Sequence, residues 1–168
     1  MEKVNIVLGR FQPFTLGHLK CCTNTYKKTG LKTVLCIIDT IKTDARHPFS
    51  TQLLWPAFKE LVNDYEEIQD IALVKCADIV KIKEILEKKD YEIVSFTCGT
   101  DRYNMYKKMC NRYAPEIKVI EIQRSDDDIS ATQVRNSIKM DNKKTFEKLT
   151  PAPIHKIYDK LKKSLDDV

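Results

Sequence analysis

Residues 9–18 read Gly-Arg-Phe-Gln-Pro-Phe-Thr-Leu-Gly-His and directly follow a short apolar run, residues 4–8. The run has the length and composition of a β-strand. A strand that ends in a loop with Gly and Pro exposes backbone N–H groups, and the next helix offers its N-terminus to an anion. Arg10 and His18 add side-chain donors. The segment therefore predicts a phosphate-binding loop.

A second candidate phosphate site lies in residues 129–135, which read Ile-Ser-Ala-Thr-Gln-Val-Arg. Ser130 and Gln133 are three residues apart, which fits a capping box and predicts that a helix begins at Ser130. The start of such a helix attracts phosphate oxygens, and Ser130, Thr132 and Arg135 add donors. Capping boxes and surface arginines are also common structural features. The segment gains weight because it follows a strand at the same sheet edge as the first motif.

Strand and helix patterns alternate through most of the chain. Residues 33–39 form a continuous apolar, β-branched run, which is typical of a strand buried on both faces of a parallel sheet. The expected strands are residues 4–8, 33–39, 71–76, 93–98 and 117–122, and the expected helices are residues 19–28, 51–64, 79–88, 101–113, 131–140, 143–149 and 154–165. This order predicts an α/β, Rossmann-like fold: a parallel five-stranded sheet with helices on both faces and a C-terminal helical extension.

Ligands of such sheets bind at the carboxyl ends of the strands, near the point where the strand order reverses. Four loops follow strands and are expected to meet at that edge, namely residues 9–18, 40–50, 99–102 and 125–135. The length matches a single domain, residues 1–168. Within it we expect a Rossmann-like core in residues 1–125, followed by the motif helix and C-terminal helices in residues 126–168.

The composition of the chain indicates which classes of binding partner to expect. The net charge is +5, but the lysines are scattered and frequently adjoin acids, which suits an anionic small molecule and makes nucleic acid an unlikely partner. The sequence shows neither an apolar run of membrane-spanning length nor a signal-peptide pattern, so we expect no membrane partner. Six cysteines without a C-x-x-C pair are interpreted as reduced, mostly buried thiols, which predicts a cytoplasmic protein.

The two phosphate motifs together resemble the nucleotidyltransferase superfamily. Its marks are an H/T-x-G-H motif, here residues 15–18, and a C-terminal I-S-x-T-x-x-R motif, here residues 129–135. The Gly-Arg-Phe-Gln-Pro-Phe opening is similar to nicotinamide-mononucleotide adenylyltransferases of the NadM and NadR type and to small phage homologues. Residues 45–50 are similar to the N-P-F-[ST] stretch of those enzymes, and residues 99–102 to a G-[ST]-D-[RK] turn of the superfamily.

The resemblance implies an enzyme that transfers AMP from ATP to a phosphate-bearing acceptor, with nicotinamide mononucleotide the first choice. Pyrophosphate leaves by direct in-line displacement, without a covalent enzyme intermediate. The catalytic residues implied are His18, Arg135 and Thr15, which takes the place of the first motif histidine. The residues implied for ATP and its phosphates are Gly9, Arg10, Phe11, Gly17, His18, Asp101, Arg102, Ser130, Thr132 and Arg135. Mg²⁺ would travel with the triphosphate, held mainly by phosphate oxygens, with no metal site in the protein.

Arg10, Phe49 and Trp55 are the expected acceptor contacts, but the acceptor is the least secure part of this interpretation. The acid-arginine pair that NadM-type enzymes commonly carry after N-P-F-[ST] is replaced here by Gln52-Leu53-Leu54-Trp55. Phosphopantetheine or a phospho-alcohol as acceptor, CTP as nucleotide, and a nucleotide-binding module without catalysis therefore stay open. The last helix either caps the domain or pairs with a second subunit, which leaves a homo-oligomer open.

Overall fold

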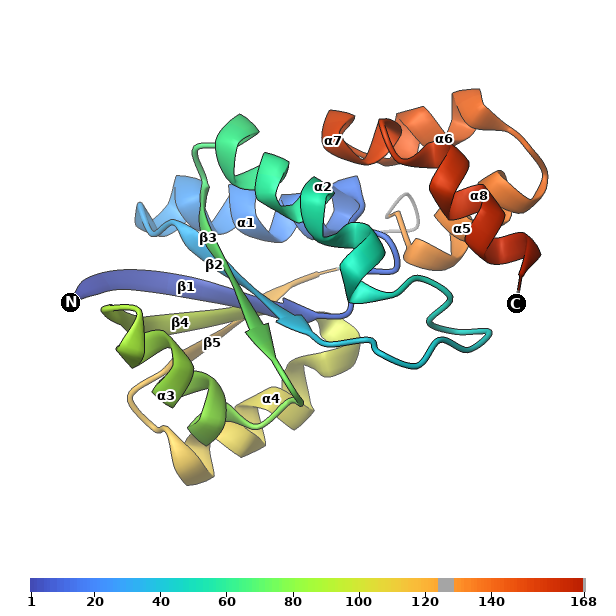
Figure 1. The fold of residues 1–168 in the computed structure, drawn as a ribbon. Helices are drawn as coiled ribbons and strands as arrows, with labels where there is room; N and C mark the ends of the chain where they lie inside the picture. Colours follow the sequence, from blue (N-terminus) through green and yellow to red (C-terminus); the bar gives the residue numbers. More distant parts are fainter. Residues whose placement is uncertain (124–128, 168) are drawn as a thin grey trace.

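The computed structural model describes residues 1–123 and 129–167 and shows the expected α/β architecture (Figure 1). In chain order the elements are β1 (Glu2–Gly9), α1 (Leu16–Thr29), β2 (Thr33–Ile38), α2 (Thr51–Asp64), β3 (Ile68–Val74), α3 (Ile79–Lys88), β4 (Tyr91–Gly99), α4 (Thr100–Tyr113), β5 (Lys118–Ile122), α5 (Ala131–Lys139), α6 (Lys143–Leu149), α7 (Ala152–His155) and α8 (Tyr158–Asp166). The five strands are all parallel and lie in the order β3-β2-β1-β4-β5. The order reverses between β1 and β4, so their carboxyl ends mark the expected ligand edge.

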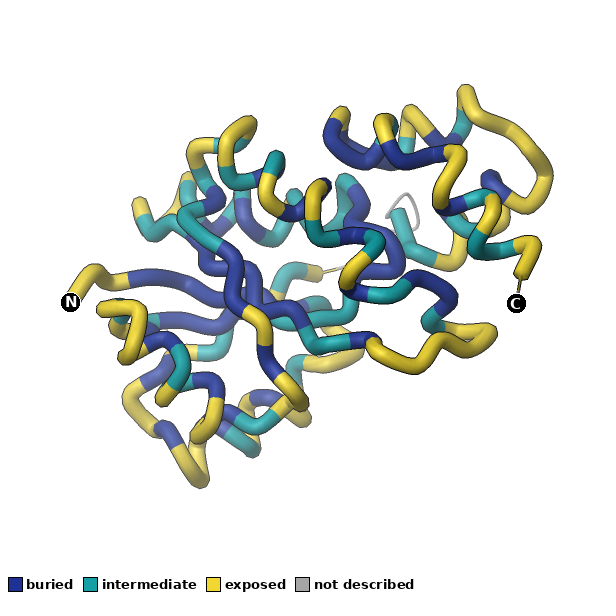
Figure 2. The backbone as a smooth tube through the Cα atoms, viewed as in Figure 1, coloured by how far each residue is buried: buried dark blue, intermediate teal, exposed yellow. Residues whose placement is uncertain are grey.

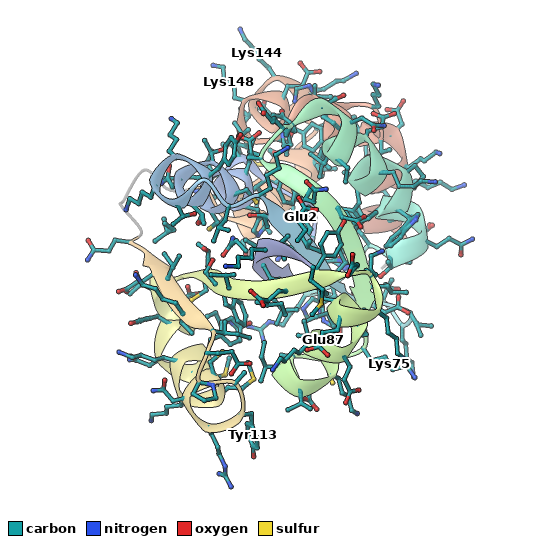
Figure 3. All side chains as sticks on the ribbon, turned by 90° about the vertical axis from the view of Figure 1, so that its left-hand side faces the viewer. Glu2, Lys75, Glu87, Tyr113, Lys144 and Lys148 are labelled. Atoms are coloured by element: carbon teal, nitrogen blue, oxygen red, sulfur yellow. The ribbon has the colours of Figure 1, made fainter. Side chains whose placement is uncertain are left out.

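Each face of the sheet has its own apolar core. Figure 2 shows buried residues along the strands between these two cores. Leu35 and Ile37 of β2 pack on the side of α1 and α2, whereas Val34 and Cys36 pack on the side of α3 and α4. Both sets are completely buried, which explains why the strand reads as an unbroken apolar run. Charged side chains such as Lys75, Lys144 and Lys148 are exposed and point away from the cores (Figure 3).

The C-terminal extension packs on the same side as α1 and α2. Val134 of α5, Phe146 of α6 and Leu161 of α8 are completely buried in that core. The single helix expected over residues 154–165 is wrong, because the chain forms α7 and α8 with a turn between them. Helix α7 contacts α2 and α6, whereas α8 contacts α5, so the turn lets both helices bury their apolar faces.

Several element boundaries differ from the expected ones. Helix α1 begins at Leu16 rather than at residue 19, because Thr15 caps it. Strand β3 spans Ile68–Val74 rather than residues 71–76, because its pairing with β2 begins at Ile68. Cys76 consequently follows the strand and is exposed, whereas Cys36 is buried, and burial raises the pKa of its thiol to about 12. None of the described helices is long and apolar enough to cross a membrane.

A buried polar network joins three strands to α1. Asn5 Nδ2 donates to Thr33 Oγ1 at 2.9 Å, and Asn5 Oδ1 accepts from Ser95 Oγ at 2.7 Å and Thr97 Oγ1 at 2.9 Å. Thr97 Oγ1 also lies 2.7 Å from Thr25 Oγ1 of α1. Thr33 and Ser95 are the residues opposite Asn5 in the two neighbouring strands. The network thus fixes strand register and holds the helix that carries the first motif.

Replacing Asn5 with alanine is expected to lower the free energy of unfolding by about 3 kcal/mol, because the buried hydroxyl groups of Thr33, Ser95 and Thr97 each lose a partner, at about 1–3 kcal/mol for a group left unpaired. Urea denaturation measures this loss. Asn104→Ala, at an exposed position of α4, is the matched control and is expected to change stability by less than about 0.5 kcal/mol. Equal effects of the two variants would contradict a stabilising role for the network.

Candidate functional site

The first motif forms a tightly packed loop between β1 and α1. The Phe11 backbone has φ 52°, in the left-handed region that a bulky residue seldom adopts. Its ring is 4% exposed and contacts Phe14 and Phe58, so core packing holds this backbone conformation in place. Gly9 leaves room for the ring, because a Cβ at this position would lie 3.2 Å from it. The loop is therefore a fixed structure rather than an open coil.

His18 is oriented by Thr15, three residues earlier. Thr15 Oγ1 accepts the N–H groups of Gly17 at 3.1 Å and His18 at 3.3 Å, and His18 Nδ1 accepts the Thr15 N–H at 2.9 Å. From this last bond we assign the ring proton of His18 to Nε2. Phe11 and Phe14 pack against the ring, with centroids 4.9 and 5.4 Å away. Thr15 itself is completely buried, so it positions the histidine rather than facing a ligand.

The second motif begins α5 as expected. Ser130 Oγ accepts the Gln133 N–H at 3.2 Å, and Gln133 Oε1 accepts the Ser130 N–H at 2.9 Å, which forms the capping box. One turn later, Arg135 Nη1 donates to the backbone carbonyl of Gln12 at 2.8 Å, and Nη2 donates to Thr132 Oγ1 at 3.3 Å. Arg135 is therefore the side chain that joins the two motifs, although 123 residues separate it from Gln12.

Backbone packing joins the motifs a second time, at Gly17. A Cβ at this position would lie 2.5 Å from the carbonyl oxygen of Ile129, a distance that real Cβ atoms essentially never show. Glycine is therefore needed here for close approach rather than for an unusual φ. The contact sets the N-terminus of α1 against the segment that leads into α5. Both helix N-termini consequently lie at one place, which favours binding of an anion.

Replacing Gly17 with alanine is expected to push the Ile129 segment away, which costs about 2 kcal/mol of stability, as overpacking usually does. It should also weaken binding of inorganic tripolyphosphate, because the two helix N-termini move apart. Thermal unfolding and calorimetric titration with tripolyphosphate measure the two effects. The control is Gly99→Ala, whose Cβ would meet the movable Asp101 carboxylate at 3.0 Å and should cost much less stability. A Gly17→Ala protein as stable as this control would contradict the contact.

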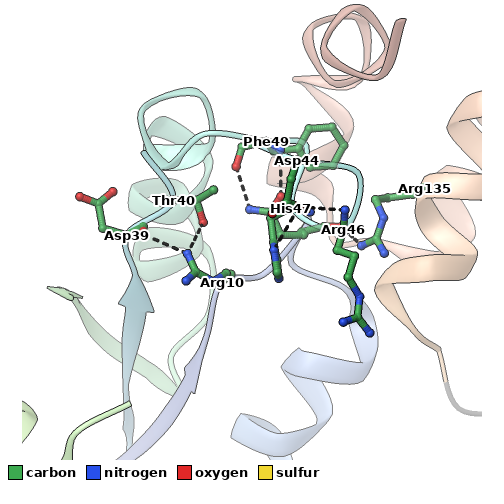
Figure 4. Close-up of polar contacts among 9 residues, drawn as sticks. Arg10, Asp39, Thr40, Asp44, Arg46, His47, Phe49 and Arg135 are labelled. Carbon is green, nitrogen blue, oxygen red and sulfur yellow. Dashed lines mark hydrogen bonds and ion pairs between the residues drawn. The ribbon is translucent and has the colours of Figure 1, made fainter. Parts of the chain in front are cut away.

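The loop of residues 40–50 completes the site, and it is tied to the first motif twice (Figure 4). Arg10 Nη1 donates to the Asp39 carbonyl at 3.0 Å and to Thr40 Oγ1 at 3.1 Å. At the other end of the loop, the Gln12 side chain bonds the backbone of Phe49.

Within this loop, Asp44 Oδ1 accepts the N–H groups of Arg46 at 2.9 Å and His47 at 2.7 Å. The bond from the His47 N–H is the main reason that the pKa of Asp44 is lowered. This turn fixes the backbone of residues 44–47, and with it the position of Arg46.

Arg46 is the site residue that the sequence interpretation missed. Burial lowers the pKa of the Arg135 guanidinium, and the positive charge of Arg46 lowers it further. The charge of one arginine thus acts on the other, and Figure 4 shows the two side chains next to each other. Arg46 is an exposed residue of a polar loop. Arg46 lies in residues 45–50, the stretch that resembles N-P-F-[ST], and this resemblance is the sequence feature that could have identified it as a candidate.

Two expected acceptor residues lie apart from this group. The Phe49 ring is completely buried in the core, so the backbone of Phe49, rather than its ring, belongs to the site. Trp55 packs against Phe58 and lines a cavity of about 380 Å³ beside β3, with Lys59, Asp70 and Lys89. None of the residues lining that cavity comes from the two motifs.

A different cavity, of about 220 Å³, lies between the end of β3 and α3. Asp39, whose carbonyl accepts the Arg10 bond, lines it together with Leu73, Val74 and Ile82. Asp101 and Arg102 are exposed in the first turn of α4, directly after the carboxyl end of β4. The acidic run of residues 126–128 lies outside the described residues.

The arrangement suits a polyanion. His18 lies in the first turn of α1, Arg135 lies in α5 and Arg46 lies near Arg135, while Arg10 belongs to the loop that leads into α1. The N-termini of α1 and α5 add partial positive charge. Within the described parts of the chain, no group of three or more His, Cys, Asp or Glu residues is placed to hold a metal ion. Such a site can position a phosphate chain and neutralise charge that builds up on it.

Comparison with known proteins supports the fold. No protein-family model and no curated protein matches the sequence. Among solved structures, nicotinic acid mononucleotide adenylyltransferase of Plasmodium falciparum complexed with APC has a TM-score of 0.60 at 16% identity, covering 94% of each chain. The same enzyme complexed with NaAD has a TM-score of 0.61 at 15% identity, again covering 94% of each chain.

The match to a third structure includes 98% of this chain and 52% of the other chain, with a TM-score of 0.67 at 18% identity. That structure is a bifunctional NMN adenylyltransferase/ADP ribose pyrophosphatase from Francisella tularensis, complexed with AMP and a Mn ion. Sequence identities this low are evidence for a shared fold only. The chain therefore has the Rossmann-like fold of the mononucleotide adenylyltransferases, the nucleotidyltransferase fold that its two motifs resemble.

Proposed function

We propose that this protein is an adenylyltransferase that transfers AMP from ATP to a pyridine mononucleotide, with nicotinamide mononucleotide the first choice, to give NAD and pyrophosphate. The observation that carries the proposal is the junction of the two phosphate motifs. The Arg135 bond to the Gln12 carbonyl and the Gly17–Ile129 contact bring two helix N-termini together. Support also comes from the fold, which is shared with enzymes whose names state adenylyl transfer to NMN or nicotinic acid mononucleotide.

In the proposed reaction a phosphate oxygen of the acceptor attacks the α-phosphorus of ATP from the side opposite the β-phosphate. A new P–O bond forms while the bond from the α-phosphorus to the bridging oxygen breaks, and pyrophosphate leaves with the electron pair. The protein contributes position and charge neutralisation. His18 Nε2–H would donate to the α- and β-phosphate oxygens, where charge builds in the transition state. Thr15 holds that ring in the required tautomer.

The leaving pyrophosphate would be held by Ser130, Thr132 and Arg135, as the motif resemblance implies, and we add Arg46. The adjoining carboxyl end of β4 would place Asp101 and Arg102 near the nucleotide. Gly9, Phe11 and Gly17 shape the loop and expose its backbone. Arginines suit this role because their planar donors match phosphate oxygens.

The acceptor phosphate is assigned to Arg10, whose position is fixed by Asp39 and Thr40. The cavity of about 220 Å³ that Asp39 lines would take a planar ring, and its mainly apolar lining suits one. We therefore favour this cavity over Trp55 for the acceptor base, and give Phe49 the role of bonding Gln12 through its backbone.

A divalent cation would supply further charge neutralisation on the triphosphate. The described residues offer no carboxylate cluster for it, so its ligands would be mainly phosphate oxygens, as Mg²⁺ prefers with nucleotides. One of the similar structures was complexed with a Mn ion. We propose Mg²⁺ for this protein. Location in the cytoplasm and self-association stay predictions from the sequence.

The test is a panel of ATP and CTP against nicotinamide mononucleotide, nicotinic acid mononucleotide, phosphopantetheine and a phospho-alcohol. Pyrophosphate release gives the rate, and mass spectrometry identifies the product. We expect ATP with nicotinamide mononucleotide to give NAD fastest. A preference for CTP, or for an acceptor without a pyridine ring, would overturn the proposed substrate. ATP binding without pyrophosphate release for any pair would show a binding module instead of an enzyme.

A further inference from the structure

Gln12 connects three segments of the site through three polar atoms. Its side-chain Nε2 donates to the Phe49 carbonyl at 2.8 Å, and its Oε1 accepts the Phe49 N–H at 2.9 Å. Its own backbone carbonyl accepts Arg135 Nη1 at 2.8 Å (Figure 4). The first motif, the 40–50 loop and α5 therefore meet at this single residue.

The two segments that Gln12 holds each carry one of the neighbouring arginines. Phe49 lies three residues after Arg46 and close to the end of the loop that presents it. Arg135 reaches the Gln12 carbonyl directly. Arg46 and Arg135 lie next to each other in Figure 4, and the bonds of Gln12 hold both segments that carry these two like charges. A movement of Gln12 would displace both cations at once.

Gln12 is poorly placed to touch a ligand itself. It is 4% exposed, and both polar atoms of its side chain already bond the Phe49 backbone. The two side-chain bonds of Gln12 end on the loop that carries Arg46. We therefore expect their loss to weaken ligand binding, in addition to any loss of stability that the removal of two buried bonds would cause anywhere in the fold.

We propose that Gln12 is a positioning residue that sets the separation of Arg46 and Arg135 for the β- and γ-phosphates. The proposal rests on the proposed function only for the identity of the ligand, the triphosphate of ATP. The chemistry needs nothing more than a chain of phosphates, so inorganic tripolyphosphate serves as a probe that requires no transfer reaction.

The test compares Gln12→Met with Thr33→Val. Methionine has a similar length and makes neither bond to Phe49. Thr33→Val also removes a buried bond, to Asn5, but at the amino end of β2, away from the motifs. For Gln12→Met we expect calorimetry to show about tenfold weaker tripolyphosphate binding, the effect of losing a contact worth roughly 1.4 kcal/mol. Thr33→Val should bind as the natural protein does, at a comparable loss of thermal stability.

Two further measurements separate positioning from simple destabilisation. In a protein that already carries Arg46→Ala, Gln12→Met should weaken tripolyphosphate binding by less than about twofold. The effects of two substitutions are not additive when one residue acts through the other. In the transfer assay, the KM for ATP should rise while the KM for the acceptor stays unchanged. If Gln12→Met does not fold, Gln12→Glu replaces it, since a carboxylate keeps the acceptor for the Phe49 N–H and loses the donor.

The proposal is overturned if Gln12→Met binds tripolyphosphate as tightly as Thr33→Val does. It is also overturned if Gln12→Met weakens tripolyphosphate binding by the same factor with and without the Arg46 side chain. Failure of the proposed function looks different. In that case the natural protein binds tripolyphosphate and responds to Gln12→Met, yet releases no pyrophosphate with any acceptor. A natural protein that does not bind tripolyphosphate would refute both.

Discussion

Replacing His18 with alanine is expected to lower kcat for AMP transfer by about 10²–10³-fold, the usual cost of removing one fixed donor to charge that develops in a transition state. The ring is held by the Thr15 N–H on one nitrogen and by two phenylalanine rings, so its orientation is set before the reaction. The loss should appear in kcat rather than in the KM for ATP, because the interaction strengthens in the transition state.

Stopped assays of pyrophosphate release measure the effect at saturating substrates. His155→Ala is the matched control, since His155 Nε2 lies 2.9 Å from the Glu147 carbonyl and 2.8 Å from the Thr150 carbonyl, in the C-terminal helices. It is expected to lose a little stability and to keep kcat within about twofold, an interval well below the effect of a lost transition-state donor. A His18→Ala protein that turns over at the natural rate would refute the mechanism.

The second large effect is expected for Arg135→Ala, with kcat/KM for ATP about 100-fold lower. Hydrogen bonds to charged groups contribute about 1.5–3 kcal/mol, and this change removes the phosphate contact and the bond to the Gln12 carbonyl together. Arg135→Lys keeps the charge but cannot copy two donors that reach Gln12 and Thr132 from separate nitrogens. Lysine should therefore restore only part of the loss.

Initial rates over a range of ATP concentrations measure this effect, with ATP affinity measured in parallel by calorimetry. Arg112→Ala removes an arginine of α4 that packs 5.2 Å from the Tyr113 ring, away from both motifs, and should leave kcat/KM unchanged. An equal loss in the two variants would indicate a general charge effect. No loss in Arg135→Ala would remove the second motif from the site.

Local sequence patterns were sufficient to predict those helices whose ends are set by residues close to them in the sequence. Helices α2, α3 and α6 have the residue ranges expected from the sequence. Polar caps mark their starts: Ser50 Oγ, Asp78 Oδ1 and Asn142 Oδ1 each accept a backbone N–H of the first turn. The capping box at Ser130 was also legible, because its two partners lie three residues apart. Patterns of this kind depend on neighbours in sequence.

The sequence was insufficient where contacts between distant segments decide the outcome. Residues 154–165 read as one amphipathic helix, and the turn between α7 and α8 arises from packing on different partners. Arg46 differs from other loop arginines only by its place in residues 45–50, and its proximity to Arg135, 89 positions later in the printed sequence, is evident only in the fold. Phe49 was expected to contact the acceptor with a ring that the fold buries completely.

The pair of arginines beside two helix N-termini has a consequence for the protein without its substrate. Because the pKa of Arg135 is lowered in the fold, its charge opposes folding at every pH below that value and is relieved only in strong alkali. The opposition is therefore constant across the physiological range, and anions relieve it where pH does not. Under the proposed function the triphosphate of ATP is such an anion, so added ATP is expected to raise the midpoint of thermal unfolding.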